Sequence, residues 1–247
     1  MTNLHDWFKT PLGHYLLEHE QACIDRMVSD VFGFNAMQMG LPQVDFLQAS
    51  RIPFRFKVDT EGNVQLRSDP CNLPVASQSI DLLILPHVLE FSANPHQVLR
   101  EVERVLMPEG YVIISGFNPW SLWGVWHALN RSRGEYPWRG KLVPLLRLKD
   151  WLALLGFEVT AGRMCCYAPP INRETWLRRF SFMEPAGDRW WAMGGGAYFL
   201  QAKKRVHSMR LIMPKWYERV APEKGLAGVA QKSGKYQNHV QKMDDNP

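Results

Sequence analysis

Residues 64–118 read VQLRSDPCNLPVASQSIDLLILPHVLEFSANPHQVLREVERVLMPEGYVIISGFN, and this stretch decides the fold. It contains two short apolar runs, residues 80–85 and residues 111–115. The first run is interrupted only by Asp81, and neither run alternates apolar with polar side chains. Runs of this kind are typical of strands that are buried on both faces, as in a parallel sheet.

The segment between these two runs has the pattern of a helix. Asn94 is a good N-cap, and Pro95 suits the first helical position. The apolar residues that follow recur on one helical face: Val98, Leu99, Val102, Val105 and Leu106. A strand, a helix and a second strand within this length predict a right-handed βαβ unit. Its ligand would lie beyond the carboxyl ends of the two strands, at residues 85–87 and 115–118.

Length and composition predict one α/β domain of ordinary size with appendages. The chain has 247 residues, of which 46% are hydrophobic. It lacks both a secretory signal pattern and any apolar run near the roughly 18 residues that a membrane helix needs. Its four cysteines form neither a C-x-x-C pair nor a zinc pattern. These features predict a cytoplasmic protein with reduced thiols and no metal site.

The positive charge is concentrated at the C-terminal end of the chain. The formal net charge is +5, and the chain from Lys203 onward has ten Lys or Arg residues against four Asp or Glu, a balance of +6. The remaining 19 basic and 20 acidic residues sum to −1, which argues against a nucleic-acid-binding face on the domain. We expect residues 205–247 to form a basic, largely disordered tail, which is the part of the chain suited to nucleic acid.

The chain before residue 64 predicts a helix and several short strands. Residues 1–30 are expected to form an N-terminal helix, and residues 31–40 a first strand that ends at Gly40. Residues 52–58 and 64–67 are two further strand-like runs, separated by a cluster of turn-forming residues. No crossover helix fits between these runs, so they could form an antiparallel hairpin.

Three motifs in the same order resemble a known enzyme family. They are residues 68–74 (SDPCNLP), residues 79–83 (SIDLL) and residues 104–110 (RVLMPEG). Together they resemble class I S-adenosylmethionine-dependent methyltransferases, most closely the type 11 group. The whole chain is also similar to a bacterial subgroup of uncharacterised methyltransferase-like proteins with the same S-G-F-N-P segment. The resemblance implies a Rossmann-like α/β sheet, mostly parallel with an antiparallel last strand and modified in its first half.

The resemblance also implies a cofactor, S-adenosyl-L-methionine, and a set of residues that would hold it. The matching positions are Gly40, Asp69, Pro70, Cys71, Leu85, Pro86 and His87. Asp69 would accept a hydrogen bond from the adenine amino group, and Gly40 would stand at the first glycine of the cofactor loop. The alternative for Asp69 is a turn carboxylate that caps neighbouring N–H groups.

Possible catalytic groups follow the fourth and fifth strands. His87 is a weak candidate for a general base, and a structural histidine is an equal alternative. Glu90 and Asn118 are also expected to face the crevice, whereas Asp81, inside its strand, is expected to be structural. The small-molecule acceptor would be apolar or planar.

The sequence departs from the family at two places. The glycine-rich loop is reduced to Gly40, and Asp45 and Asp59 are both poorly placed to serve as the acidic residue that ends the second strand and holds the ribose hydroxyls. Only 28 residues separate Gly40 from Asp69, too few for the usual helix, strand and helix. A catalytically inactive binding or regulatory module is therefore an alternative to a methyltransferase.

Beyond Asn118 the sequence becomes rich in aromatic residues. Eight of the ten tryptophans lie between Trp120 and Trp191. We interpret residues 119–196 as an aromatic insertion within a domain that spans residues 31–204. Three interpretations of the tryptophans remain open: a lid over the acceptor, helices packed on the sheet, and a membrane-surface patch.

Overall fold

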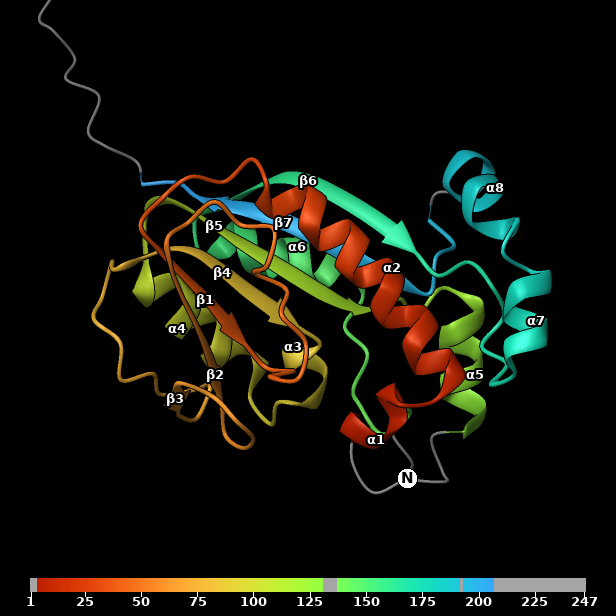
Figure 1. Cartoon of the computed structure of the whole chain (residues 1–247). Helices are drawn as coiled ribbons and strands as arrows, with labels where there is room; N and C mark the ends of the chain where they lie inside the picture. Colours follow the sequence, from red (N-terminus) through yellow and green to blue (C-terminus); the bar gives the residue numbers. More distant parts are fainter. Residues whose placement is uncertain (1–3, 131–136, 192, 207–247) are drawn as a thin grey trace, which may run out of the picture. The chain divides into compact units, whose positions relative to one another are not determined.

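The computed structural model describes residues 4–130, 137–191 and 193–206 (Figure 1). The strands in these residues are β1 (Asn35–Met39), β2 (Phe54–Asp59), β3 (Leu66–Arg67), β4 (Ile80–Pro86), β5 (Leu106–Phe117), β6 (Phe157–Cys165) and β7 (Ala197–Lys204). The helices are α1 (Leu4–Phe8), α2 (Pro11–Val28), α3 (Val88–Phe91), α4 (Pro95–Val105), α5 (Leu122–Asn130), α6 (Leu145–Leu154), α7 (Glu174–Arg179) and α8 (Met183–Trp190). The predicted disordered tail lies outside the described residues, apart from its first two positions.

One sheet contains the seven described strands, in the order β3-β2-β1-β4-β5-β7-β6. The pairs from β3 through β5 are parallel, whereas β7 pairs antiparallel with both β5 and β6. The predicted fold class, a mostly parallel Rossmann-like sheet with an antiparallel last strand, is confirmed. The strand order reverses between β1 and β4, and a ligand crevice is expected at the carboxyl ends beside such a switch point.

The suggested antiparallel hairpin in the first half of the chain is wrong. β2 and β3 pair in parallel, with Val58 opposite Leu66 and Asp59 opposite Arg67. A parallel pair normally needs a long crossover, because the chain must return along the whole strand. Here β3 pairs only with the last two residues of β2, so the short loop of residues 60–65 is long enough to make the return.

The predicted βαβ unit is present as β4, α4 and β5. The expected buried face of α4 is correct, since Val98, Leu99, Val102 and Val105 are all fully buried. Asn94 precedes the helix, but its side chain makes no capping hydrogen bond. The second strand starts earlier than predicted, at Leu106, because Leu106 pairs with Ile80 across a register shift.

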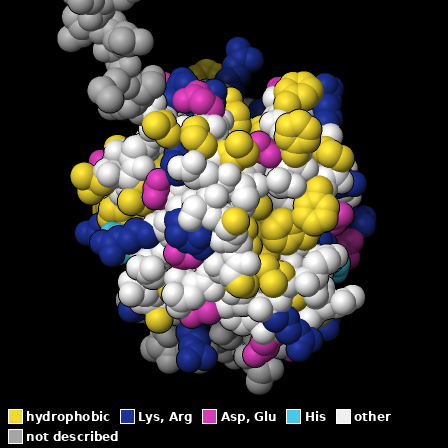
Figure 2. Space-filling view, turned by 90° about the vertical axis from the view of Figure 1, so that its left-hand side faces the viewer, with side chains coloured by type: hydrophobic (Ala, Val, Ile, Leu, Met, Phe, Trp, Pro, Cys, Tyr) yellow, Lys and Arg dark blue, Asp and Glu magenta, His cyan; other side chains and the backbone are white. Residues whose placement is uncertain are grey.

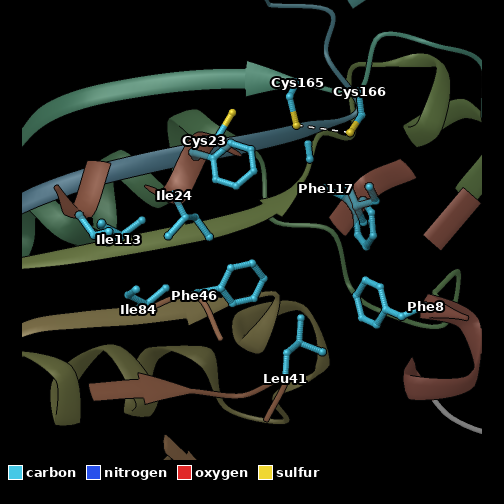
Figure 3. Packing of buried hydrophobic residues seen from close by; sticks show 14 of the residues in the cluster. Phe8, Cys23, Ile24, Leu41, Phe46, Ile84, Ile113, Phe117, Cys165 and Cys166 are labelled. Carbon is cyan, nitrogen blue, oxygen red and sulfur yellow. Dashed lines mark hydrogen bonds between the residues drawn. The ribbon is translucent and has the colours of Figure 1, made fainter. Parts of the chain in front are cut away.

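Successive side chains of β4 alternate between two hydrophobic clusters, one on each face of the sheet. Leu82 and Ile84 belong to the cluster that α2 and the loop after β1 cover. Leu83 and Leu85 belong to the cluster covered by α4 and α6. In the first cluster, Ile24 of α2 lies over the strands beside Ile84 (Figure 3). The sheet is therefore buried on both faces, as its unbroken apolar runs predict.

The N-terminal region forms two helices where the sequence predicted one. Thr10 ends the first and caps the second, because its hydroxyl oxygen accepts a hydrogen bond from the Gly13 N–H at 3.1 Å. The buried face of α2 includes a charged residue, Glu20. No helix of the described residues has the length and apolar content needed to cross a bilayer.

Candidate cofactor-binding site

A cavity of about 610 Å³ lies at the carboxyl ends of β1, β2 and β4. Its walls come from four segments: residues 40–43, residues 59–62, residues 69–71 and residues 86–93 with the exception of Leu89 and Glu90. Gly40 ends β1, Asp59 ends β2 and Pro86 ends β4. The cavity therefore occupies the place that the strand order assigns to a ligand.

Gly40 allows the chain to turn sharply where β1 meets the cavity. Its φ of +89° lies in the left-handed region that glycine adopts without steric cost. Its N–H donates to the Val58 carbonyl oxygen at 2.9 Å, which ties the turn to β2. A Cβ at this position would lie 2.7 Å from Val88 Cγ2 across the cavity wall. A glycine is thus required both by the backbone and by the space around it.

No helix joins β1 to β2, and a buried glutamine organises the connection instead. The amide nitrogen of Gln38 donates to the carbonyl oxygens of Gly40, Leu41 and Val44 at 3.0–3.1 Å. Its amide oxygen accepts from the Phe46 N–H at 3.0 Å. The predicted shortage of residues for a crossover helix is confirmed. The sequence signal for this arrangement was a polar residue, Gln38, within a buried strand, and this signal was missed.

Asp69 caps its own turn and also lines the cavity, so its position is consistent with both roles that the sequence left open. Its carboxylate accepts a hydrogen bond from the Cys71 N–H at 2.9 Å, so it caps its own turn. It is also exposed and lines the cavity together with Pro70 and Cys71. The cap accounts for one carboxylate oxygen, and a carboxylate has further lone pairs with which to accept hydrogen bonds from a ligand.

Asp59 is better placed than the sequence suggested. It is the last residue of β2 and lines the cavity on the same side as Glu61. One carboxylate oxygen accepts from the Thr60 N–H at 2.7 Å, which orients the side chain. The judgement that Asp59 is poorly placed was wrong, because the apolar run was taken to end at Val58. The acidic residue at the end of the second strand is therefore present.

His87 borders the cavity, but its imidazole is buried between two carboxylates. Nε2 lies 2.6 Å from Glu20 Oε1 of α2, and Nδ1 lies 2.7 Å from Glu90 Oε2 of α3. The other oxygen of Glu90 accepts from the Phe117 N–H. All three side chains in this Glu20–His87–Glu90 cluster are essentially inaccessible to solvent. The cluster ties α2 to the ends of β4 and β5.

The two carboxylates hold His87 in its charged form. Burial alone lowers the pKa of a histidine, but the charges and hydrogen bonds of Glu20 and Glu90 outweigh burial and raise the pKa of His87 to about 10. Burial raises the pKa of Glu90 above its ordinary value, although His87 and the Phe117 N–H act in the opposite direction. Both ring nitrogens of the His87 imidazolium are hydrogen-bonded to carboxylates, so neither is free to take a proton from a substrate. This geometry argues against His87 as a general base.

Three other expected site residues lie away from the cavity. Leu85 is fully buried in the cluster beneath α4 and α6. Glu90 points into the buried cluster rather than into the crevice. Asn118 is also buried, and its amide nitrogen donates to the carbonyl oxygens of Met193 and Gly195. The expectation that Glu90 and Asn118 face the crevice is therefore wrong.

Asp81 has the structural environment that its position inside a strand suggests. One of its carboxylate oxygens accepts from the N–H groups of Phe34 and Asn35 at 2.8 and 2.9 Å. These contacts fix the start of β1 against β4, at the end of the sheet opposite the cavity.

No tryptophan of the described residues lines the cavity, so the aromatic segment does not form a lid over it in this structure.

Residues 41–114 match a family model described as a methyltransferase domain. A relative from Escherichia coli K12, the uncharacterized protein YafS, is 32% identical over 155 residues, which cover 62% of this chain and 65% of YafS. The chain thus matches less than two thirds of that relative's length.

Solved structures of other proteins share the fold of this chain. A protein from Thermotoga maritima, described as a SAM-dependent methyltransferase and possible histamine N-methyltransferase, has a TM-score of 0.54 and 15% identity, covering 78% of this chain and 97% of the other. The N-methyltransferase NodS from Bradyrhizobium japonicum, in complex with S-adenosyl-L-homocysteine, has a TM-score of 0.53 and 9% identity, covering 79% of this chain and 89% of NodS. At these identities the likeness concerns the fold alone.

The residues around the cavity fit an adenosyl cofactor. Gly40 and Val88 both line the cavity, and the Val88 side chain packs against the position that a Cβ of Gly40 would take. Asp59 and Asp69 offer carboxylate oxygens that accept hydrogen bonds from hydroxyl and amino groups. Pro70, Val88 and Phe91 supply apolar surface to the same cavity. This mixture of apolar walls and few polar groups is typical of a small-molecule site.

Proposed function

We propose that this protein is an S-adenosyl-L-methionine-dependent methyltransferase that acts on a small, apolar or planar acceptor. The observation that carries the proposal is the cavity at the strand ends, in which Gly40 and the carboxylates of Asp59 and Asp69 come together. The family match of the surrounding domain supports it. A cytoplasmic location is part of the proposal, and four unbridged cysteines support it.

Each segment of the cavity has a proposed role in binding. Asp59 accepts hydrogen bonds from the ribose hydroxyls, and Asp69 accepts one from the adenine amino group. Pro70 and Cys71 lie against the adenine ring. Pro86 and His87 border the methionine part, and the buried cluster behind His87 keeps this stretch of backbone in place. The backbone at Gly40 and the Val88 side chain packed against it border the ligand together.

The reaction needs little further machinery from the chain. S-adenosylmethionine, when bound, supplies an activated methyl group on a sulfonium. Alignment of the acceptor with that methyl group accounts for most of the rate effect. We therefore assign no catalytic base, and His87 acts by positioning the loop after β4.

A non-catalytic binding module is the second candidate. It is favoured by the absence of a helix between β1 and β2 in the described residues, because the N–H groups of such a helix would otherwise face a bound ligand. Under this alternative the cavity binds an adenosyl compound for regulation, and no acceptor is methylated.

A thermal-shift titration with S-adenosylmethionine and S-adenosylhomocysteine tests cofactor binding. Ligand at about 100 times its dissociation constant should stabilise the fold by about 2.7 kcal/mol. For a chain of this size, that corresponds to a rise in Tm of about 5–10 °C. No shift with either compound at millimolar concentration would contradict both candidates. A shift without methyl transfer to a panel of apolar and planar acceptors would favour the binding module.

Replacing Asp59 or Asp69 with alanine should weaken binding of S-adenosylhomocysteine by about tenfold or more, since each change removes a hydrogen-bond acceptor from the ligand. Calorimetric titration of each variant measures the effect. Asp45→Ala is a matched control: Asp45 caps the Leu47 N–H at 3.1 Å two residues on, as Asp69 caps Cys71, but it does not line the cavity. Equal affinity in the Asp69→Ala variant and the control would show that Asp69 only caps its turn and does not contact the ligand.

A further inference from the structure

Helix α5 has its apolar and polar faces reversed with respect to an ordinary surface helix. Its exposed residues are Leu122, Val125, Trp126 and Leu129, which recur at i, i+3, i+4 and i+7 and therefore form one stripe. Their exposed fractions are 52%, 59%, 42% and 69%. A helix of a globular protein normally turns such a stripe toward the core. We call these four residues the α5 stripe.

The opposite face of α5 carries the polar residues, and they are satisfied inside the protein. The ring Nε2 of His127 lies 2.9 Å from the Gly140 carbonyl oxygen. Asn130 is buried and its amide nitrogen donates to the Trp126 carbonyl oxygen. Trp123 is fully buried, and its indole N–H donates to the Ala168 carbonyl oxygen at 2.9 Å. These contacts fix the rotation of the helix, so the α5 stripe faces outward as a consequence of the fold.

Further exposed aromatic residues lie just before α5 and around α8. Trp120, at the entry to α5, is 83% exposed. Trp190 and Trp191, at the end of α8, are 74% and 63% exposed, and Phe182, just before α8, is 63% exposed. Tryptophan combines an apolar ring with a polar N–H, and this suits it to the boundary between water and lipid.

Two exposed basic side chains, Arg139 and Lys141, lie on the segment that packs against α5, and we call them the basic border. They flank Gly140, whose carbonyl oxygen contacts His127 on the face of α5 opposite the stripe. Among the described residues, neither Arg139 nor Lys141 is in an ion pair with a carboxylate. Helix α5 itself carries no Lys, Arg, Asp or Glu. A helix with an uncharged apolar stripe on one face and basic residues on the side behind it has the pattern of a segment that lies on an anionic membrane surface.

The same region adjoins the candidate cofactor site. A Cβ at Gly140 would lie 3.0 Å from the Phe91 ring, and Phe91 lines the cavity. The Lys141 N–H donates to the Glu90 carbonyl oxygen at 2.8 Å. The basic border is therefore packed directly against α3, which forms part of the cavity wall.

We propose that the α5 stripe, with Arg139 and Lys141, docks this protein on the surface of an anionic lipid bilayer. The side chains of the stripe enter the boundary between headgroups and acyl chains, and the two basic residues lie among the phosphates. The proposal stands independently of methyl transfer.

Two other occupants of the α5 stripe fit less well. Four partly exposed apolar side chains offer on the order of 400 Å², about half of the roughly 800 Å² that each partner buries in a stable interface. A second copy of the chain would therefore be held weakly. The sequence from Lys203 onward carries an excess of positive charge, as do Arg139 and Lys141. Like charges repel, so the C-terminal part of the chain is a poor occupant and instead adds to the attraction of an anionic surface.

Vesicle sedimentation with the full-length protein tests the proposal. The probes are phosphatidylcholine vesicles and vesicles of an equal mixture of phosphatidylcholine and phosphatidylglycerol. We expect the protein to partition onto the mixed vesicles and only weakly onto phosphatidylcholine. The double variant Val125→Ser, Trp126→Ser should lower the partition coefficient by about tenfold or more, because both changes remove apolar surface from the lipid boundary. The double variant Arg139→Ser, Lys141→Ser should lower it on the mixed vesicles alone.

Phe34→Ser is the matched control. Phe34 is 77% exposed, but it lies beside the start of β1, at the end of the sheet away from the cavity. Figure 2, viewed from the left-hand side of Figure 1, shows that hydrophobic side chains reach the surface on that side as well. This variant should bind vesicles as well as the unchanged protein does.

Three results would overturn the proposal. One is no partition onto either kind of vesicle. The second is equal binding by the Val125→Ser, Trp126→Ser variant and the unchanged protein, because the C-terminal charge would then suffice. The third is a dimer in sedimentation velocity that the same double variant dissociates, which would make the α5 stripe an interface between copies. Circular dichroism of each variant confirms that a loss of binding does not come from unfolding.

Discussion

Replacing His87 with glutamine should lower the free energy of unfolding by about 3–5 kcal/mol. The imidazolium is the positive charge between the buried carboxylates of Glu20 and Glu90, with heavy-atom distances of 2.6 and 2.7 Å. Without it, two carboxylates share a solvent-free site with no counter-charge, and that is costly in a medium of low polarity. Urea unfolding measures the change, which corresponds to a fall in Tm of about 10 °C. His14→Gln is the control, since His14 is exposed on the same helix as Glu20 and its loss should cost less than about 0.5 kcal/mol.

The stability of the unchanged protein should also fall as the pH rises. The folded-state pKa of His87 is about 10, above the ordinary value of 6.5, so the folded protein keeps a proton that the unfolded chain releases between these values. The contribution of His87 is complete below pH 6.5 and disappears as the pH approaches 10. The His87→Gln variant should lack this dependence. The same pH profile in both proteins would show that His87 is not the group responsible.

Replacing Gly40 with alanine should weaken binding of S-adenosylhomocysteine by about a hundredfold. The new methyl group would lie 2.7 Å from Val88 Cγ2 at the cavity wall, and the left-handed φ of +89° is unfavourable for any residue with a Cβ. The methyl group must displace Val88, which also lines the cavity, and a bound ligand opposes that displacement. An added cost of about 3 kcal/mol in the complex alone corresponds to about a hundredfold, because every 1.4 kcal/mol changes affinity tenfold. Calorimetric titration provides the measurement.

Gly156→Ala separates the effect on the cavity from the effect on the backbone. Gly156 has a φ of +80°, close to that of Gly40, but it follows α6 and the nearest atom to its Cβ would be the Arg205 carbonyl oxygen at 3.5 Å. Both variants should lose about 1–2 kcal/mol of stability through the left-handed conformation. Only Gly40→Ala should lose ligand affinity. Equal affinities in the two variants would place the ligand elsewhere.

Short-range patterns predicted the middle of this fold well. The unbroken apolar runs predicted β4 and β5, and the spacing of Val98, Val102 and Val105 predicted the buried face of α4. The same patterns placed Gly40 at the end of β1, whereas the place of Asp69 at the cavity was implied by the family resemblance. Strand and helix periods report which side of an element avoids water, and this is a local property that a sequence displays directly.

Errors occurred where the outcome depends on a neighbour distant in sequence. The direction of β3 is set by its pairing with the end of β2, and the position of Asp59 follows from the extent of that pairing. Glu20 and Asn118 are polar residues whose burial is explained only by partners brought in by the fold. A polar residue on an apolar face looks the same in sequence whether it reaches solvent or a buried partner.

The sequence by itself determined the α/β class and the βαβ unit at the centre of the sheet, because these depend on apolar periodicity and turn chemistry within a few residues. The glycine and the carboxylate at the cavity were implied by the resemblance to a known family. Only the tertiary structure decided that Glu20 meets His87 across 67 positions and that α5 turns its apolar stripe outward. The physical reason is that hydrogen bonds and charge pairs formed between distant segments select one rotation of each helix, and the pattern within a helix does not reveal which rotation its neighbours will favour.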